Sequence, residues 1–318
     1  MSHVSDRVMT NDEILAFFEN VRIRDLVSFR ALCNALKAFL VREAVQVWRA
    51  DSSGRLSVLD LGCGRGGDLR KWSSYRLRSF VGVDGGATSV EEARARHADL
   101  VAQGKSAVHA VFHTADVTLS ALPADSGTFD IVSSMFFVQF CFSTSVAAAH
   151  VLDEVTRVLK DKGVFCGILP DGDRVASLLR DRRTQVAFGH FKLHKCPLQK
   201  TQEAPYGVAY NFSLTDSACT EFVVSPKLLR KMLESRGFVG GWPGGEFFMG
   251  AQHLLSQGVE SETVSTILRG QKCSQIDWMS LGFFSVVLAK KKIPLVETKD
   301  PSPVKRRRKC DSTPGASA

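Results

Sequence analysis

The stretch LDLGCGRGGDLRKW, residues 59–72, places a glycine run between an apolar segment and a segment with helical spacing. A strand, a glycine turn and a helix in this order form the nucleotide-binding end of a βαβ unit. Such a turn can hold a dinucleotide pyrophosphate, a nucleoside phosphate or a ligand without phosphate, and it can also do no more than pack the strand against the helix. The residues beside the glycines distinguish these possibilities.

The acidic side chains around the glycine run argue against a phosphate group. Asp60 lies on the strand and Asp68 lies where the helix begins, so a carboxylate stands where the helix dipole would otherwise attract a phosphate. The glycine spacing is GxGxGG and not the GxGxxG of dinucleotide-binding turns. Asp84, at the end of the next apolar run, suits a ribose diol. A ligand with a cationic centre, a ribose and an adenine fits this pattern, and S-adenosylmethionine is such a ligand.

A further acid, Asp116, follows the third apolar run in the segment HTADVT, residues 113–118. It can accept a hydrogen bond from an adenine amino group, or it can cap a turn. Open α/β sheets bind ligands at the carboxyl ends of their strands, and Asp84 ends the neighbouring strand. We therefore expect Asp116 at the same site.

The alternation of apolar runs and helical segments predicts an α/β fold with a parallel sheet covered on both faces. The apolar runs are residues 57–62, 79–85, 107–114, 129–135 and 163–169, and helices are expected at 11–22, 27–48, 90–103 and 147–160. Farther along, the pattern predicts extended chain at 186–195 and 206–214, a helix at 225–237, a surface loop or connector at 239–250 and a closing strand at 281–289.

The net charge of +8 is concentrated at one end of the chain. Residues 290–318 carry a net charge of +6, so the remainder of the chain is nearly neutral. Any polyanion must therefore be bound by a local cluster such as residues 180–183 or 192–195. Lys305, Arg306, Arg307, Arg308 and Lys309 form a basic run that predicts a nuclear localisation signal, with a phosphate-binding or merely solvated tail as alternatives.

Cysteine spacing and hydropathy exclude several classes of protein. The eight cysteines include no CxxC pair, which argues against a disulfide framework and a thiolate zinc site. His190, His194 and Cys196 lack a fourth ligand at zinc-like spacing, so we expect no metal. No stretch approaches about eighteen consecutive apolar residues, and the first residues lack the apolar region of a secretory signal. These features indicate an intracellular protein without a membrane partner.

These motifs resemble those of the messenger-RNA cap guanine-N7 methyltransferases, and the likeness extends from about Arg24 to Lys290. Residues 58–72, VLDLGCGRGGDLRKW, are similar to the family's LDLGCGKGGDLxKW, whereas class I methyltransferases in general share only the first glycines. Residues 29–41 resemble LRNFNNWxKxxLI, and residues 129–142 resemble FDxxSxQFxxHYxF. Further resembling segments follow in the family's order at residues 83–96, 167–175, 220–232 and 277–292.

The resemblance implies a class I methyltransferase fold, Rossmann-like, with a mostly parallel seven-stranded sheet and helices on both faces. It implies transfer of a methyl group from S-adenosylmethionine to N7 of the guanine in the GpppN cap of mRNA. No catalytic acid or base is expected, because guanine N7 exposes a lone pair and the site need only hold donor and acceptor in line. The residues implied to bind S-adenosylmethionine are Lys37, Gly62, Asp68, Asp84 and Asp116, and those implied to bind the cap guanine are Asn34, Phe136, Gln139, Phe140, Pro170, Glu221 and Phe284.

The implied guanine pocket departs from the family's pattern. Gln139 and Phe140 stand for a His-Tyr pair, Cys33 for the first of two asparagines, and Phe284 for a tyrosine. Each change removes a hydrogen-bonding group, but the rings and the glutamine amide remain, so the predicted pocket is altered rather than abolished. Two other functions stay open: a catalytically weak cap-binding or regulatory subunit, and a methyltransferase for another nucleobase or a small molecule.

The resemblance and the composition together divide the chain into three parts. We expect an N-terminal extension at residues 1–23, a methyltransferase domain at 24–292 with a cap-pocket subdomain at about 185–280, and a disordered basic tail at 293–318. The implied partners are capped RNA and other capping enzymes, and the expected location is the nucleus, where transcripts are capped.

Overall fold

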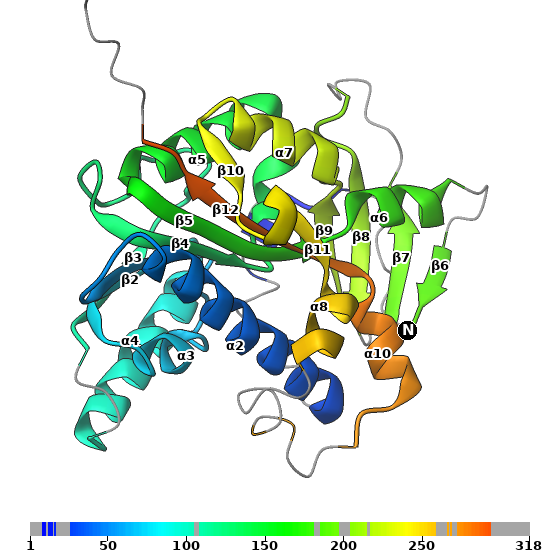
Figure 1. Cartoon of the computed structure of the whole chain (residues 1–318). Helices are drawn as coiled ribbons and strands as arrows, with labels where there is room; N and C mark the ends of the chain where they lie inside the picture. Colours follow the sequence, from blue (N-terminus) through cyan, green and yellow to red (C-terminus); the bar gives the residue numbers. More distant parts are fainter. Residues whose placement is uncertain are drawn as a thin grey trace, which may run out of the picture.

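The chain folds around a large sheet and a smaller one (Figure 1). This computed structural model describes residues 8–10, 12–14, 16, 26–104, 108–180, 185–196, 204–214, 217–258, 266, 268 and 272–293. Most of the helix expected at 11–22 and the tail beyond Ile293 lie outside these residues, although residues 12–14 and 16 are helical.

The large sheet has the strand order β10-β12-β5-β4-β1-β2-β3, and β11 also pairs with β12. The neighbours from β3 to β5 run parallel, whereas β12 runs antiparallel to β5, β10 and β11. The fold class predicted from the sequence is confirmed, with β11 as an eighth, short strand beside the expected seven. The strands are β1 Leu56–Leu61, β2 Leu77–Asp84, β3 Ala110–Thr114, β4 Phe129–Met135, β5 Leu159–Pro170, β10 Phe238–Gly240, β11 Phe248–Gly250 and β12 Phe284–Lys291.

Helices cover both faces of this sheet and bury one apolar core on each (Figure 1). β1 and β4 are buried at every residue because both of their faces are covered, as is usual for parallel strands. One core receives residues of α2 Val27–Arg49, α3 Leu69–Ser73, α4 Ala87–Ala102, α6 Gly172–Leu179, α8 Ala251–Gly258 and α10 Gln275–Leu281. The other core receives residues of η1 Val138–Ser143, α5 Ser145–Val158 and α7 Pro226–Glu234.

The smaller sheet is an antiparallel meander of four strands in the order β6-β7-β8-β9. Its strands are β6 Gln185–Phe188, β7 Phe191–Lys195, β8 Ala209–Leu214 and β9 Ser217–Phe222. The predictions of extended chain at 186–195 and 206–214 are therefore confirmed. After β9 the chain returns to the large sheet through α7 and β10.

The prediction of a surface loop or connector at residues 239–250 is wrong. This glycine-rich segment supplies β10, η2 Pro243–Gly245 and β11, and the side chains of Trp242 and Phe247 are buried. The glycines allow close approach, since a Cβ on Gly241 would lie 2.8 Å from Leu288 Cγ. Strands of three residues are too short to show alternation in the sequence.

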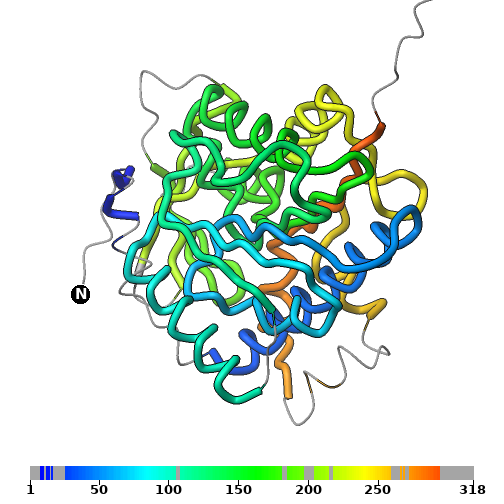
Figure 2. Tube along the Cα trace, turned by 90° about the vertical axis from the view of Figure 1, so that its left-hand side faces the viewer, coloured from blue at the N-terminus to red at the C-terminus, as the bar shows by residue number. Residues whose placement is uncertain are grey.

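The described N-terminal residues lie against the smaller sheet (Figure 2). The Met9 N–H donates to the Thr220 hydroxyl on β9 at 2.8 Å. Ile14 is 7% exposed. The described part of the expected extension therefore packs on the fold.

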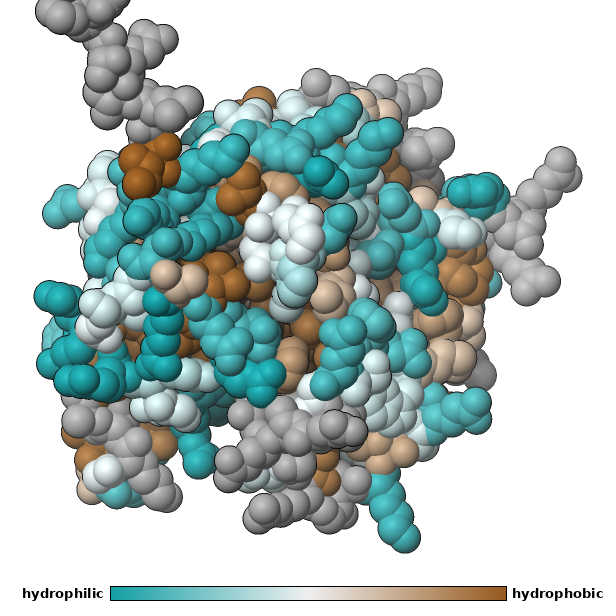
Figure 3. All heavy atoms as spheres, in the orientation of Figure 1, coloured by the Kyte–Doolittle hydropathy of each residue, from teal (hydrophilic) through white to brown (hydrophobic). Residues whose placement is uncertain are grey.

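On the face of the molecule seen in Figure 3, hydrophilic side chains predominate and apolar ones form small, separate patches. Among the described residues, no helix is both long enough and apolar enough to cross a membrane. The large apolar side chains lie mainly in the two cores.

Truncating a core residue of β12 should destabilise the fold. Leu288 is fully buried between β5 and the edge strands, so we expect Leu288→Ala to lower the free energy of unfolding by about 2–5 kcal/mol in urea titrations. Leu119→Ala is the matched control, because Leu119 is 79% exposed and its truncation should change this free energy by less than about 0.5 kcal/mol. Equal losses in the two variants would contradict the assignment of β12 to the core.

Candidate functional site

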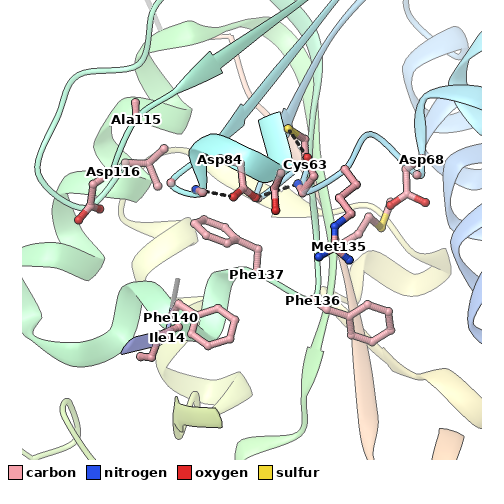
Figure 4. Close-up of a pocket in the computed structure, with 18 of the residues that line it drawn as sticks. Ile14, Cys63, Asp68, Asp84, Ala115, Asp116, Met135, Phe136, Phe137 and Phe140 are labelled. Atoms are coloured by element: carbon pink, nitrogen blue, oxygen red, sulfur yellow. Dashed lines mark hydrogen bonds between the residues drawn. The ribbon is translucent and has the colours of Figure 1, made fainter. Parts of the chain in front are cut away.

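A cavity of about 430 Å³ opens where the loops after β1, β2, β3 and β4 meet (Figure 4). Ligands of open α/β sheets bind at this end of the strands. The residues that line the cavity are Ile14, Lys37, residues 62–65, Gly67, Asp68, residues 84–86, Ser89, residues 115–118, residues 135–137 and Phe140.

The loop after β1 takes a conformation that requires glycine. Gly62 and Gly64 have φ angles of 67° and 49°, in the left-handed region that side chains rarely adopt. A Cβ on Gly62 would also overlap the ring of Phe137, which packs directly against the loop. The Gly62 N–H donates to Val83 O at 2.8 Å, so the loop is attached to the end of β2.

Asp84, the last residue of β2, is held by two turns. Its Oδ2 accepts a hydrogen bond from the Gly64 N–H at 2.8 Å, and its Oδ1 accepts one from the Gly86 N–H at 2.9 Å (Figure 4). Each carboxylate oxygen has a second lone pair, so the group can still accept from a ligand. The result is an oriented acceptor at the wall of the cavity.

Asp68 forms a compact ion cluster with two lysines at another part of the wall. Lys37 Nζ and Lys71 Nζ each lie 2.7 Å from an oxygen of Asp68, whose side chain is 10% exposed. Burial acts to raise the pKa of Asp68, but the two lysine charges outweigh it and lower this pKa to about 2. The cluster presents a carboxylate and ammonium groups side by side, which complements the ammonium and carboxylate of a free amino acid.

Asp60, which helped to argue for a cationic ligand, lies behind the cavity wall. It is 2% exposed and its Oδ1 accepts from the Ser133 hydroxyl of β4 at 2.6 Å. Burial raises the pKa of Asp60 to about 7, and the nearby charge of Asp68 acts in the same direction. Asp60 therefore links β1 to β4.

Asp116 fits both of the readings that the sequence left open. Its Oδ1 accepts from the backbone N–H of Thr118 at 2.9 Å and from the hydroxyl of Thr118 at 2.6 Å, so it caps the turn after β3. Asp116 also lines the cavity. The turn therefore fixes one carboxylate oxygen of a residue at the cavity wall.

Aromatic rings of the loop after β4 connect the cavity to the end of β12. Phe136 has a φ angle of 66°, which is rare for a bulky residue and is found where function constrains the backbone. Its ring meets Phe284 edge to face at a centroid distance of 4.9 Å, and Lys37 Nζ lies 5.4 Å from its centroid. Phe140 lines the cavity close to Ile14 (Figure 4).

Glu221 lies in a buried polar group beside these rings. Its Oε2 accepts from the Tyr210 hydroxyl at 2.6 Å, and its Oε1 accepts from Gln139 Nε2 at 3.4 Å. Glu221 is 6% exposed and Gln139 is 2% exposed. Burial raises the pKa of Glu221 to about 7, and the two hydrogen bonds act against this rise.

The structure brings the residues of the predicted cofactor site together. All five of them line the cavity: Lys37, Gly62, Asp68, Asp84 and Asp116.

The predicted guanine residues are divided between several places. Phe136 and Phe140 line the cavity, Gln139 contacts Glu221 behind it, and Pro170 pairs with Phe284 across β5 and β12. Asn34 is exposed and accepts from Lys71 Nζ at 3.1 Å, beside the ion cluster of Asp68.

Several residues of this region were not assigned to a site from the sequence, among them Phe137, Ile14 and Tyr210. Phe137 and Ile14 line the cavity, and Tyr210 hydrogen-bonds Glu221. The position of Phe137 between two other predicted residues is a signal that was available. Tyr210 lies in a segment predicted to be extended, but the sequence does not give the strand register that places it opposite Glu221, and Ile14 carries no motif.

The fold is the Rossmann-like α/β fold of class I methyltransferases. The crystal structure of a S-adenosylmethionine-dependent methyltransferase from Clostridium acetobutylicum ATCC 824 is similar, with a TM-score of 0.51 and 12% sequence identity, over 89% of this chain and 99% of that chain. At this identity the likeness concerns the fold alone. The model of the mRNA (guanine-N(7))-methyltransferase domain matches residues 12–239. The chain belongs to this family.

Curated relatives in several eukaryotes are similar over much of the chain. The mRNA cap guanine-N(7) methyltransferase of Caenorhabditis elegans is 29% identical over 64% of this chain and 56% of that protein. The enzyme of the same name from Saccharomyces cerevisiae is 27% identical over 70% of this chain and 54% of that protein. The mRNA cap guanine-N(7) methyltransferase 1 of Oryza sativa subsp. japonica is 31% identical over 56% of this chain and 51% of that protein. The matched region therefore spans about half the length of these relatives.

Replacing Lys37 with methionine should make the free energy of unfolding depend less on pH in the acidic range. The pKa of Asp68 is lowered to about 2 from an ordinary 3.8, so its ion pairs stabilise the fold at neutral pH and lose this effect as the pH falls toward 2. We expect Lys37→Met to cost about 2 kcal/mol near pH 6 and roughly half as much near pH 3, measured by urea unfolding. Arg230→Met, which removes an exposed partner of Glu234, should change little at either pH. A Lys37→Met penalty that is equal at the two pH values would contradict this assignment.

Proposed function

We propose that this protein transfers a methyl group from S-adenosylmethionine to N7 of the guanine in the GpppN cap of mRNA, with S-adenosylhomocysteine as the other product. The observation that carries the proposal is the cavity with an ion cluster and an oriented Asp84 on its wall, next to the buried Glu221, in a chain of the mRNA (guanine-N(7))-methyltransferase family. We take the methyl acceptor, the cap guanine, from the names of the relatives. The charges and hydrogen-bonding groups of the cavity support this acceptor and S-adenosylmethionine as the cofactor.

The cavity residues fit S-adenosylmethionine by charge and hydrogen bonding. Asp68 and Lys37 complement the amino and carboxylate groups of its methionyl part, and Asp84 can accept from its ribose hydroxyls. Asp116 offers an acceptor for the adenine amino group. When bound, the cofactor supplies an electrophilic methyl group on a positively charged sulfur, and the acidic side chains on the wall suit that charge.

The acceptor side needs recognition and alignment rather than acid–base catalysis. Guanine N7 would supply an in-plane lone pair to the methyl group of the cofactor, whose sulfur would keep the electrons of the broken bond, so no residue would need to move a proton. Glu221, as a carboxylate beside the amide of Gln139, can accept a hydrogen bond from the edge of guanine that carries N1–H and the 2-amino group, an edge that adenine does not present. Phe136 and Phe284 supply apolar surface for the face of the base.

The proposal extends to partners and location. Capped RNA is the partner that the reaction requires, and the enzymes that build GpppN supply it. Residues 185–280 serve as the cap-pocket subdomain of a domain at 24–292, and the basic tail at 293–318 directs the protein to the nucleus. The tail lies almost wholly outside the described residues, and its support is the run of five basic residues at 305–309.

A methyl-transfer assay on GpppG-capped RNA tests the function. We expect Asp84→Ala to weaken S-adenosylhomocysteine binding in calorimetry by tenfold or more. The substitution removes a hydrogen-bond acceptor for the ligand and both hydrogen bonds that join the two loops. We expect Glu221→Ala to bind S-adenosylhomocysteine normally but to lose most methyl transfer. Retained binding of the GpppG dinucleotide by Asp84→Ala, and of S-adenosylhomocysteine by Glu221→Ala, would show that each variant is folded.

Wild-type behaviour in the same assay separates the alternatives. A regulatory subunit would bind GpppG without turnover, and a methyltransferase for another acceptor would bind S-adenosylhomocysteine and ignore GpppG. Either result would overturn the proposed reaction.

Removal of residues 293–318 tests the tail. If the tail is a nuclear signal, a fluorescent fusion of the truncated chain should leave the nucleus while purified protein keeps its methyl-transfer rate. If the tail instead binds RNA phosphates, the truncation should raise KM for capped RNA and weaken the salt dependence of binding. The second result would contradict the assignment of a purely targeting role.

A further inference from the structure

We propose that Tyr210 is a positioning residue for guanine recognition. Its hydroxyl donates a hydrogen bond to one carboxylate oxygen of Glu221 and favours the ionised side chain. The other carboxylate oxygen then accepts a hydrogen bond from the base. This inference rests on the proposed function, since it names a group that acts through Glu221. Neither the family motif nor the cavity lining includes Tyr210.

The geometry fixes the two side chains to one another. Tyr210 and Glu221 are directly opposite on the antiparallel strands β8 and β9, and both are buried. The hydroxyl donates to Glu221 Oε2 at 2.6 Å, a short distance that is typical of a hydrogen bond to a carboxylate. The Tyr210 hydroxyl, on the smaller sheet, thus fixes the orientation of the Glu221 carboxylate. The other oxygen, Glu221 Oε1, lies on the side of η1.

Gln139 forms only a long hydrogen bond with the remaining oxygen, Glu221 Oε1. Its Nε2 lies 3.0 Å from Phe136 O but 3.4 Å from Glu221 Oε1, close to the limit for a hydrogen bond. Its Oε1 is buried and has no hydrogen-bond partner within the part of the chain that the structure describes. Two adjacent acceptors, one weakly held and one unpartnered, match the N1–H and 2-amino donors along the edge of guanine. The long Gln139–Glu221 contact is the one that a bound base would replace.

Hydrogen bonds, and not a neighbouring cation, stabilise the charged form of Glu221 within the described residues. The titratable groups that interact with it are Tyr210 on β8 and Cys219 on its own strand, whereas the facing residue of η1 is the uncharged Gln139. Lys195, beside Tyr210 on β7, is exposed. Burial raises the pKa of Glu221 to about 7, and the Tyr210 hydrogen bond acts to lower it. Loss of the hydroxyl would therefore raise this pKa further.

Equilibrium binding of the GpppG dinucleotide between about pH 6 and about pH 8.5 tests the inference, with protein saturated in S-adenosylhomocysteine. In the wild type, affinity should rise with pH through a midpoint near 7, as Glu221 loses its proton. Tyr210→Phe should move the midpoint upward by about one pH unit, which makes binding roughly fivefold weaker near pH 7, roughly tenfold weaker near pH 6 and nearly normal at the highest pH. Glu221→Gln should bind weakly without this pH dependence.

Tyr206→Phe is the matched control, because the Tyr206 hydroxyl contacts Met232 Sδ and not Glu221. It should leave the midpoint unchanged. Binding of S-adenosylhomocysteine reports whether each variant is folded, since Tyr210 does not line that cavity. A loss in Tyr210→Phe that is equal at every pH, or a midpoint identical to that of the wild type, would overturn the inference alone. Wild-type protein that binds S-adenosylhomocysteine but no GpppG at any pH would overturn the proposed function and this inference with it.

Discussion

The carboxylate of Asp84 is the junction on which the site depends. It accepts the N–H groups of Gly64 and Gly86, so the loop after β1 and the turn before α4 converge on one anionic group. Gly62 makes this possible, because its left-handed backbone turns the loop back toward the end of β2. A carboxylate held at both oxygens cannot swing into the solvent, so the cavity keeps an oriented acceptor before any ligand arrives. Such preorganisation reduces the entropy that binding must overcome.

The loop after β4 joins the two halves of the site. Phe136 adopts a strained left-handed backbone, and the change of direction that follows sends Phe137 against the glycine loop while Phe136 meets Phe284. Gln139 donates back to Phe136 O and also reaches Glu221. A single turn therefore connects the surroundings of Glu221 with the wall of the cavity. Strain of this kind is found where the surrounding contacts hold it in place for function.

The sequence indicated which residues meet at the cavity more readily than which residues surround Glu221, for a physical reason. Asp84 and Asp116 each follow an apolar run, and parallel strands end at one edge, so pattern alone brings them together. Tyr210 and Glu221 meet through the register of a hairpin, which the alternation of apolar residues does not define when both strands are buried. The edge strands β10 and β11 were mistaken for a loop because three residues show no period and their glycines resemble turn signals. Trp242 and Phe247, both buried, were the available indication of burial there.

The departures from the family's pattern have a common consequence for the acceptor site. Phe284 packs at 5.6 Å from Phe191 and 5.3 Å from Phe283, and at 7% exposure it lies in an aromatic cluster where a hydroxyl would need a buried partner. Gln139, in place of histidine, removes a group that can carry a positive charge next to Glu221. In the function we propose, the phenylalanines would contact the face of the base, and Glu221 with its two hydrogen-bonding neighbours, Tyr210 and Gln139, would recognise its edge. With no cation against it among the described residues, this carboxylate depends for its charge on the donors that surround it.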